Sequence, residues 1–204
     1  MTPRVILLHG IWNAGAWLAP LAARLRMAGF APEIAGYASV FSRPEATLPR
    51  LIARLSAGGE AMIVGHSLGG LIALETLRQA PDLPVSRVVC LGSPLRGSAT
   101  ASRIAGRTLT APVLGLSAGL LQRGFAHWDG RAAVGMVAGN VPHGLGRLLA
   151  SVDADSDGTV ALSETRLSGL ADHCTVACSH SGLVFSAAAA AQAAAFLRDG
   201  RFRH

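Results

Sequence analysis

Short apolar runs alternate with segments of helical pattern along most of the chain. The apolar runs predict strands at 5–8, 32–35, 61–64, 85–91, 132–138 and 175–177. Between them, apolar side chains return at helical spacing, and glycines at 29, 58 and 59 follow two of these segments, as they commonly follow helices. We therefore expect helices at 17–28 and 44–55, a helix-like run at 71–77, and an alanine-rich closing helix at 186–197.

Strands that alternate with helices in this way are typical of an α/β fold. We expect a mostly parallel sheet of about six strands with helices on both faces, because parallel sheets are buried on both sides. The alternation of strands and helices is interrupted at 93–129. This segment is either a small cap over a site or a core helix with long connections. The 204 residues suit one domain spanning 1–204.

Composition excludes several classes of protein. Half of the residues are hydrophobic and 15% are charged, which indicates a globular rather than a disordered chain. No run is long and apolar enough to predict a membrane span. The first apolar run, 5–8, is too short for a signal peptide, so we expect a cytoplasmic protein.

Charge and cysteine content narrow the choice of partners. The net charge of +6 would attract anionic substrates or bring transient contact with lipid surfaces, although all 18 basic residues are arginines scattered along the chain. No basic run predicts nucleic-acid binding. Three cysteines are too few for a disulfide framework, and Cys174 and Cys178 have no partner pair at zinc spacing. We expect no metal and no cofactor.

The segment from Gly65 to Gly70 carries the clearest chemical signal. Here a G-x-S-x-G motif stands between an apolar run and a helix-like run, which is the pattern of a nucleophile elbow. Such a turn is so sharp that side chains at Gly65 and Gly69 would clash. Ser67 is therefore the candidate nucleophile, presented at the carboxyl edge of the sheet and at a helix N-terminus.

A serine needs a base to take its proton and a third group to orient that base. With this elbow, the acid and then the histidine follow the serine along the chain. His180 stands directly after the last predicted strand, as the base requires. His173 precedes that strand and would lie at the wrong end of the sheet. His66 is too close to Ser67 to turn back on it, and we expect it to pack beside the turn.

The acid is expected between the last two strands, where an acidic loop begins at Asp153. We assign Asp157, with Asp155, Asp153 and Asp129 as alternatives. Residues 153–164 also match the calcium loop of an EF-hand, with Glu164 in its twelfth position. The flanking sequence lacks the two long helices and the second loop of a paired EF-hand. A calcium-binding module built on this loop is nevertheless a competing interpretation.

A serine nucleophile also needs amides that stabilise a negative oxygen. One would come from Leu68, directly after the serine. The other would come from the turn after the first strand, where Gly10 permits a close approach and Ile11 supplies the amide. Trp12 and Trp17 stand near this turn, and the sequence leaves open whether they bind an acyl group or pack in the core.

These motifs together resemble the α/β-hydrolase superfamily, and most closely its small bacterial lipases and esterases with little or no lid. The likeness covers nearly the whole chain. The matching segments are His9-Gly10, the elbow at 65–70, the Gly-Ser-Pro-x-x-Gly-Ser segment at 92–98, Asp157-Gly158-Thr159-Val160, and His180 with Leu183.

The resemblance implies a Ser67–Asp157–His180 triad, oxyanion amides at Ile11 and Leu68, and hydrolysis of a small carboxylic ester with an apolar acyl group. The sequence departs from the family in two ways. The family's first two strands are missing, and the signal peptide that the family's secreted lipases usually carry is not predicted here. The second departure favours an intracellular ester. A thioesterase or acyltransferase with the same triad fits equally, and a hydrolase fold that binds without catalysis is a further alternative.

Overall fold

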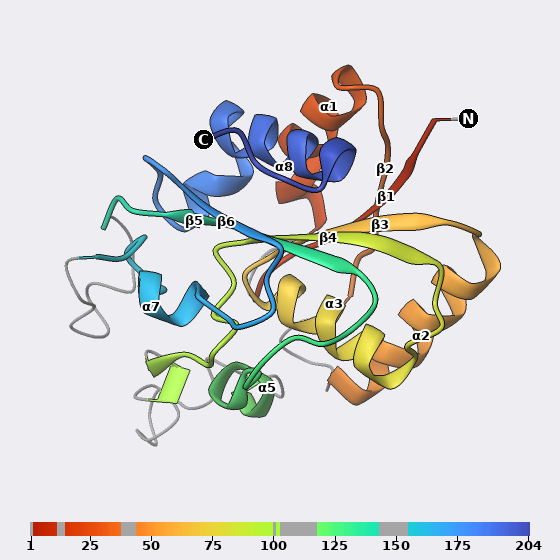
Figure 1. Ribbon diagram of the computed structural model, residues 1–204, viewed down its shortest axis with the longest axis horizontal. Coiled ribbons are helices and arrows are strands. Elements are labelled where there is room, and N and C mark those ends of the chain that lie inside the picture. Colours follow the sequence, from red (N-terminus) through yellow and green to blue (C-terminus); the bar gives the residue numbers. More distant parts are fainter. Residues whose placement is uncertain (1, 12–14, 38–43, 100, 103–117, 143–154) are drawn as a thin grey trace.

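The structure is a computed structural model that describes residues 2–11, 15–37, 44–99, 101–102, 118–142 and 155–204. Its centre is one sheet of six parallel strands in the order β2-β1-β3-β4-β5-β6 (Figure 1). The strands are β1 (Arg4–Leu8), β2 (Ala31–Ile34), β3 (Ala61–His66), β4 (Val85–Leu91), β5 (Ala133–Gly139) and β6 (Asp172–Val176). The expected parallel sheet is confirmed.

Helices cover both faces of the sheet, as the alternating pattern predicts (Figure 1). One face carries α1 (Ala19–Met27) and α8 (Ala187–Asp199), and the other carries α2 (Pro44–Ala57), α3 (Leu68–Gln79) and α5 (Ala118–Arg123). Shorter turns are η1 (Gly15–Leu18), α7 (Leu162–Thr165) and η3 (Ser181–Val184). None of the helices within the described ranges is long and apolar enough to cross a membrane.

Each central strand feeds two cores, because successive side chains of a strand point to opposite faces. In β1, Val5 and Leu7 pack with α1 and α8, whereas Ile6 and Leu8 pack with α2 and α3. All four are buried. This two-sided burial explains why the strands appear in the sequence as continuous apolar runs and not as alternating ones.

The last strand begins three residues earlier than the sequence predicts. β6 spans Asp172–Val176 at the edge of the sheet, where polar side chains are tolerated. The carboxylate of Asp172 accepts the amides of His173 and Phe202, so the polar start of the strand serves as an anchor for the C-terminal tail. Cys174 lies within β6, whereas Cys178 lies beyond the end of that strand.

The strand order places a topological switch point between β1 and β3, at the carboxyl edge of the sheet. From β1 the chain passes through α1 on one face to β2, and β3 on the other side of β1 leads into α3 on the opposite face. Ligands of open α/β sheets bind at such a switch point, beyond the carboxyl ends of the strands. The turn after β1 and the turn after β3 meet here, because Leu8 pairs with Gly65.

Candidate active site

Ser67 occupies the tight turn between β3 and α3. Its φ of 54° and ψ of −119° are strained, and no other non-glycine residue in the described ranges has a positive φ. The turn leaves no room for side chains beside it. A Cβ at Gly65 would lie 2.4 Å from the amide nitrogen of Gly70, and one at Gly69 would lie 2.4 Å from the carbonyl oxygen of Leu8. The motif therefore folds as an elbow that presents the serine side chain.

Three polar side chains meet at this elbow. Nε2 of His180 lies 3.0 Å from Oγ of Ser67, and Nδ1 of His180 lies 2.7 Å from Oδ2 of Asp157. His180 is 9% exposed, Ser67 is 7% exposed and Asp157 is 1% exposed, so water competes little with these hydrogen bonds. Residues 113 positions apart in the sequence are thus joined, because the loops after β3, β5 and β6 open at the same edge of the sheet.

The loop after β5 holds the Asp157 carboxylate in a defined orientation. Oδ1 accepts the amides of Thr159 and Val160, which leaves Oδ2 for the imidazole of His180. The carbonyl oxygen of Asp157 also accepts the backbone amide of His180 at 2.8 Å. A carboxylate accepts hydrogen bonds, so Nδ1 of the imidazole carries a proton and Nε2 is the acceptor for the Ser67 hydroxyl.

The other acidic candidates lie elsewhere. Asp155 is exposed, and Asp129 pairs with His127 at the surface with 85% of its side chain exposed. Asp153 lies outside the described residues. The carboxylate of Glu164 accepts the amide of Ala99 at 2.6 Å and that of Ala161 at 3.0 Å.

Glu164 therefore joins the chain after β4 to the loop that carries Asp157. The two acids that would be central to calcium binding, Asp157 and Glu164, both have protein partners. The described ranges contain no group of three or more His, Cys, Asp or Glu side chains arranged for a metal ion.

Two backbone segments lie beside Ser67, namely the start of α3 and the turn after β1. Leu68 is the first residue of α3, and the first four amides of a helix have no acceptor within it. The turn after β1 lies against the serine, since a Cβ at Gly10 would be 3.0 Å from Cβ of Ser67. Ile11 follows in that turn and is half-buried. The helix dipole of α3 adds partial positive charge at this point.

Tyr37 holds the turn after β1, and no sequence motif identifies it. The ring of Tyr37 stacks on that of His9 with centroids 4.3 Å apart, and its hydroxyl donates to the His9 carbonyl. Nδ1 of His9 donates to the carbonyl of Gly10, and Nε2 accepts the amide of Tyr37. Burial lowers the pKa of His9, in keeping with a neutral ring. Tyr37 is the one tyrosine in the chain, but it stands in no motif.

Of the two candidate tryptophans, the structure describes Trp17. Trp12 lies outside the described residues. Trp17 lies in η1, 45% exposed, and its ring is tilted against that of Phe185 with centroids 5.8 Å apart. Phe185 follows η3, the turn that begins after His180. An exposed aromatic pair thus joins the segment after β1 to the segment after His180, and Trp17 is not packed in the core.

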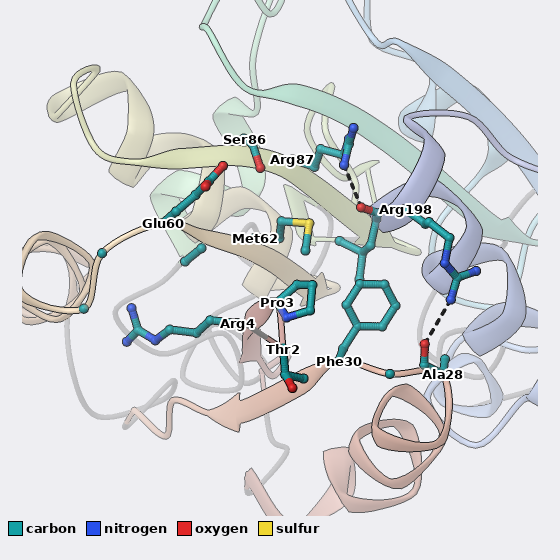
Figure 2. Close-up of a pocket in the computed structure, with 15 residues that line it drawn as sticks. Thr2, Pro3, Arg4, Ala28, Phe30, Glu60, Met62, Ser86, Arg87 and Arg198 are labelled. Carbon is teal, nitrogen blue, oxygen red and sulfur yellow. Dashed lines mark hydrogen bonds between the residues drawn. The ribbon is translucent and has the colours of Figure 1, made fainter.

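A cavity of about 730 Å³ opens at the opposite edge of the sheet, where β1, β3 and β4 begin (Figure 2). Three arginines line it, and each donates to a carbonyl at the C-terminal end of a helix. Arg4 reaches α2 at 3.5 Å, Arg87 reaches α8 at 2.8 Å, and Arg198 reaches the end of α1 at 2.9 Å. Cations stabilise helix C-termini, so these side chains have a structural role, remote from Ser67.

No family model matches the chain, and no curated protein matches it. Solved structures do. The mature lipase BlEst2 of Bacillus licheniformis has a TM-score of 0.76 at 19% identity, over 97% of this chain and 91% of that one. The metagenomic carboxyl esterase MGS0156 has a TM-score of 0.66 at 17% identity, over 88% and 64%.

Phospholipase PlaB from Legionella pneumophila has a TM-score of 0.62 at 17% identity, over 81% of this chain and 44% of its own. At these identities the likeness is one of fold. It confirms the α/β-hydrolase fold that the sequence motifs predict.

Proposed function

We propose that the chain is a serine hydrolase that cleaves carboxylic esters with an apolar acyl group. The observation that carries the proposal is the hydrogen-bond chain from the Asp157 carboxylate through His180 to the Ser67 hydroxyl. It ends at a strained elbow, and strained backbone of this kind concentrates at functional sites.

In the first half of the reaction, the Ser67 oxygen attacks the ester carbonyl while Nε2 of His180 takes the hydroxyl proton. The tetrahedral intermediate collapses when His180 passes that proton to the departing alcohol, which leaves an acyl group on Ser67. A water molecule, deprotonated by His180, then attacks the acyl-enzyme. The acid is released and Ser67 regains its proton. Asp157 keeps the imidazole in the tautomer that both halves require.

The negative oxygen of each tetrahedral intermediate would be stabilised by the amides of Leu68 and Ile11. These groups are part of the backbone, and the turn that carries Ile11 is held by the stacked His9–Tyr37 pair. Little reorganisation is therefore needed when charge develops.

Two features support an apolar ester as substrate. The structural relatives BlEst2 and MGS0156 are named as a lipase and a carboxyl esterase. The exposed pair of Trp17 and Phe185 offers an aromatic surface that links the segments after the oxyanion turn and after the base. The assignment of 1–204 to one domain, the cap at 93–129 and the cytoplasmic location stay predictions. Residues 100 and 103–117 of the cap segment lie outside the described residues.

A panel of p-nitrophenyl esters of increasing acyl length, assayed with wild type and with Ser67→Ala, tests the proposal. We expect hydrolysis by wild type, and a loss of about 10⁴-fold or more in Ser67→Ala with the fold intact. The matched control is Ser86→Ala, an exposed serine at the far end of β4. A fluorophosphonate probe should label wild type and Ser86→Ala but not Ser67→Ala. Substantial hydrolysis by Ser67→Ala would overturn the mechanism.

A further inference from the structure

His66 precedes the candidate nucleophile and makes a hydrogen bond that packing beside the turn does not require. It is the last residue of β3 and only 2% exposed. Its Nε2 lies 3.0 Å from the carbonyl oxygen of His180, and the two rings lie 4.9 Å apart at 45°. The bond joins residues 114 positions apart. It thus links β3, which leads into Ser67, to the loop that carries His180.

This bond completes the attachment of the base. The backbone amide of His180 donates to the carbonyl of Asp157, and Nδ1 of its ring donates to the Asp157 carboxylate. Both of these bonds hold His180 to the acid. The bond from His66 instead holds the backbone of His180 to the end of β3, directly before Ser67. It thereby restricts the distance between Nε2 of His180 and Oγ of Ser67.

We propose that His66 is a positioning residue, which sets the geometry of the His180–Ser67 pair by donating from Nε2 to the His180 carbonyl. The inference deepens the proposed function and rests on it in one respect, namely that the pair is the base and the nucleophile. A carbonyl oxygen can only accept, so the proton of His66 must be on Nε2. Its Nδ1 has no hydrogen-bond partner in the described part of the chain.

The surroundings keep His66 neutral. Burial, followed by repulsion from His180, lowers the pKa of His66 to about 3. The other titratable groups that act on it are the Asp157 carboxylate and the more weakly coupled His9. Neutrality matters for the proposed reaction, because His180 becomes an imidazolium in each half-reaction. A charged ring 4.9 Å away would oppose that step, whereas a neutral donor does not.

Two substitutions of the same length separate the donor from the volume of the side chain. His66→Gln can keep an N–H near the position of Nε2, whereas His66→Met has no donor. A misplacement of about 1 Å at a reacting pair costs on the order of 10²-fold in rate. For p-nitrophenyl ester hydrolysis, we therefore expect His66→Met to lower kcat by about 10- to 100-fold with KM nearly unchanged. We expect His66→Gln to recover most of that loss.

Thermal unfolding shows whether each variant is folded. If His66→Met does not fold, His66→Asn replaces it, because its amide is too short to reach the carbonyl. A second measurement does not depend on hydrolysis. The Nδ1 proton of His180, held by a carboxylate, should give a resolved downfield signal in the proton NMR spectrum. The signal should persist in His66→Gln, weaken or exchange faster in His66→Met, and be absent in His180→Gln, which identifies it.

The outcomes separate the two proposals. If wild type hydrolyses no ester in the panel while the signal responds to His66→Met as expected, the proposed function fails and the positioning role stands. If His66→Met keeps the wild-type kcat or leaves the signal unchanged, the positioning role is wrong. It is equally wrong if His66→Gln loses as much as His66→Met, because the donor would then not be what matters.

Discussion

The carboxylate of Asp157 contacts the imidazole of His180 through one oxygen only, at 2.7 Å, while its other oxygen accepts two backbone amides. The carboxylate is held by its own loop and cannot rotate away without losing those amides. Its orientation therefore does not depend on substrate. This arrangement makes the negative charge at Oδ2 the feature to test by substitution.

We expect Asp157→Asn to lower kcat for ester hydrolysis by about 10⁴-fold. Asparagine has nearly the same shape and can keep the amide contacts through its carbonyl oxygen. Its NH₂ group would then face Nδ1 of His180 and favour the tautomer with the proton on Nε2, which cannot accept the Ser67 proton. Steady-state kinetics and fluorophosphonate labelling measure the effect. Asp155→Asn, at an exposed position in the same loop, is the control.

An Asp157→Asn variant with wild-type kcat would remove Asp157 from the mechanism. If Asp155→Asn were the inactive variant instead, the assignment of the acid would move to that alternative, which the sequence leaves open.

Gly92, directly after β4, is expected to be intolerant of a side chain. It has a φ of +56°, and an added Cβ would lie 3.0 Å from Oδ2 of Asp157 and 3.3 Å from Nδ1 of His180. Gly92→Ala should therefore lower kcat by about 10- to 100-fold by displacing the acid–base pair.

Backbone strain alone should cost Gly92→Ala about 1–2 kcal/mol of stability. Gly59→Ala separates strain from displacement, because Gly59 has a φ of +70° but open space around its Cβ position. We expect the control to lose a similar amount of stability and no activity, as measured by urea unfolding and ester hydrolysis. Equal activity in the two variants would show that the pair tolerates the added methyl group.

The sequence predicts the sheet and its two helical layers well, because strands buried on both faces leave continuous apolar runs that are easy to recognise. It is less informative where polar residues enter an edge strand, as Asp172 and His173 do in β6. For the candidate site, the motif around Ser67 predicts its own local structure. The positions of Asp157 and His180 follow from the rule that parallel strands end at one edge.

Other features of the site depend on contacts between residues remote in sequence. Nothing in the pattern around Tyr37 predicts its stacking on His9, and nothing beside the elbow predicts the bond from His66 to the His180 carbonyl. The closeness of Gly92 to Asp157 and His180 is also a tertiary contact. A glycine in a short motif signals that something approaches closely, but the sequence does not say what approaches.

Calcium should not affect the stability of the chain. The Asp157 carboxylate is hydrogen-bonded to His180, and the Glu164 carboxylate accepts the amides of Ala99 and Ala161. Calcium binding would have to break these hydrogen bonds. We expect the same Tm in millimolar calcium and in EDTA, and no saturable heat in a calorimetric titration. Micromolar binding that is abolished by Glu164→Ala would support the EF-hand interpretation of residues 153–164.

Trp17 should affect acyl-chain preference if its exposed ring contacts substrate. Full burial of a large apolar side chain is worth about 1.5–3 kcal/mol, and a partial contact is worth less. Trp17→Ala should therefore raise KM for octanoyl esters by about tenfold and leave acetyl esters nearly unchanged. Met27→Ala is the control, because Met27 is also apolar and exposed but lies at the end of α1. Equal changes for short and long acyl chains would argue against an acyl contact.

The buried histidine at the elbow should make the protein sensitive to acid. The pKa of His66 falls from its ordinary value of 6.5 to about 3 on folding, mainly through burial. Between these pH values the unfolded chain binds a proton at His66 that the folded chain does not. The free energy of unfolding is therefore unaffected by this group above pH 6.5 and falls as the pH drops toward 3, by up to about 1.4 kcal/mol per pH unit.

Urea unfolding of wild type and His66→Gln at pH 7, 6, 5 and 4 measures this effect. Glutamine does not titrate, so the variant's free energy of unfolding should fall less steeply with acidification than that of wild type. Some slope should remain, because burial also lowers the pKa of His9. His127→Gln removes an exposed histidine and should leave the wild-type slope in place. Parallel pH profiles for wild type and His66→Gln would show that His66 titrates alike in the folded and unfolded chain, contrary to its burial behind Ser67.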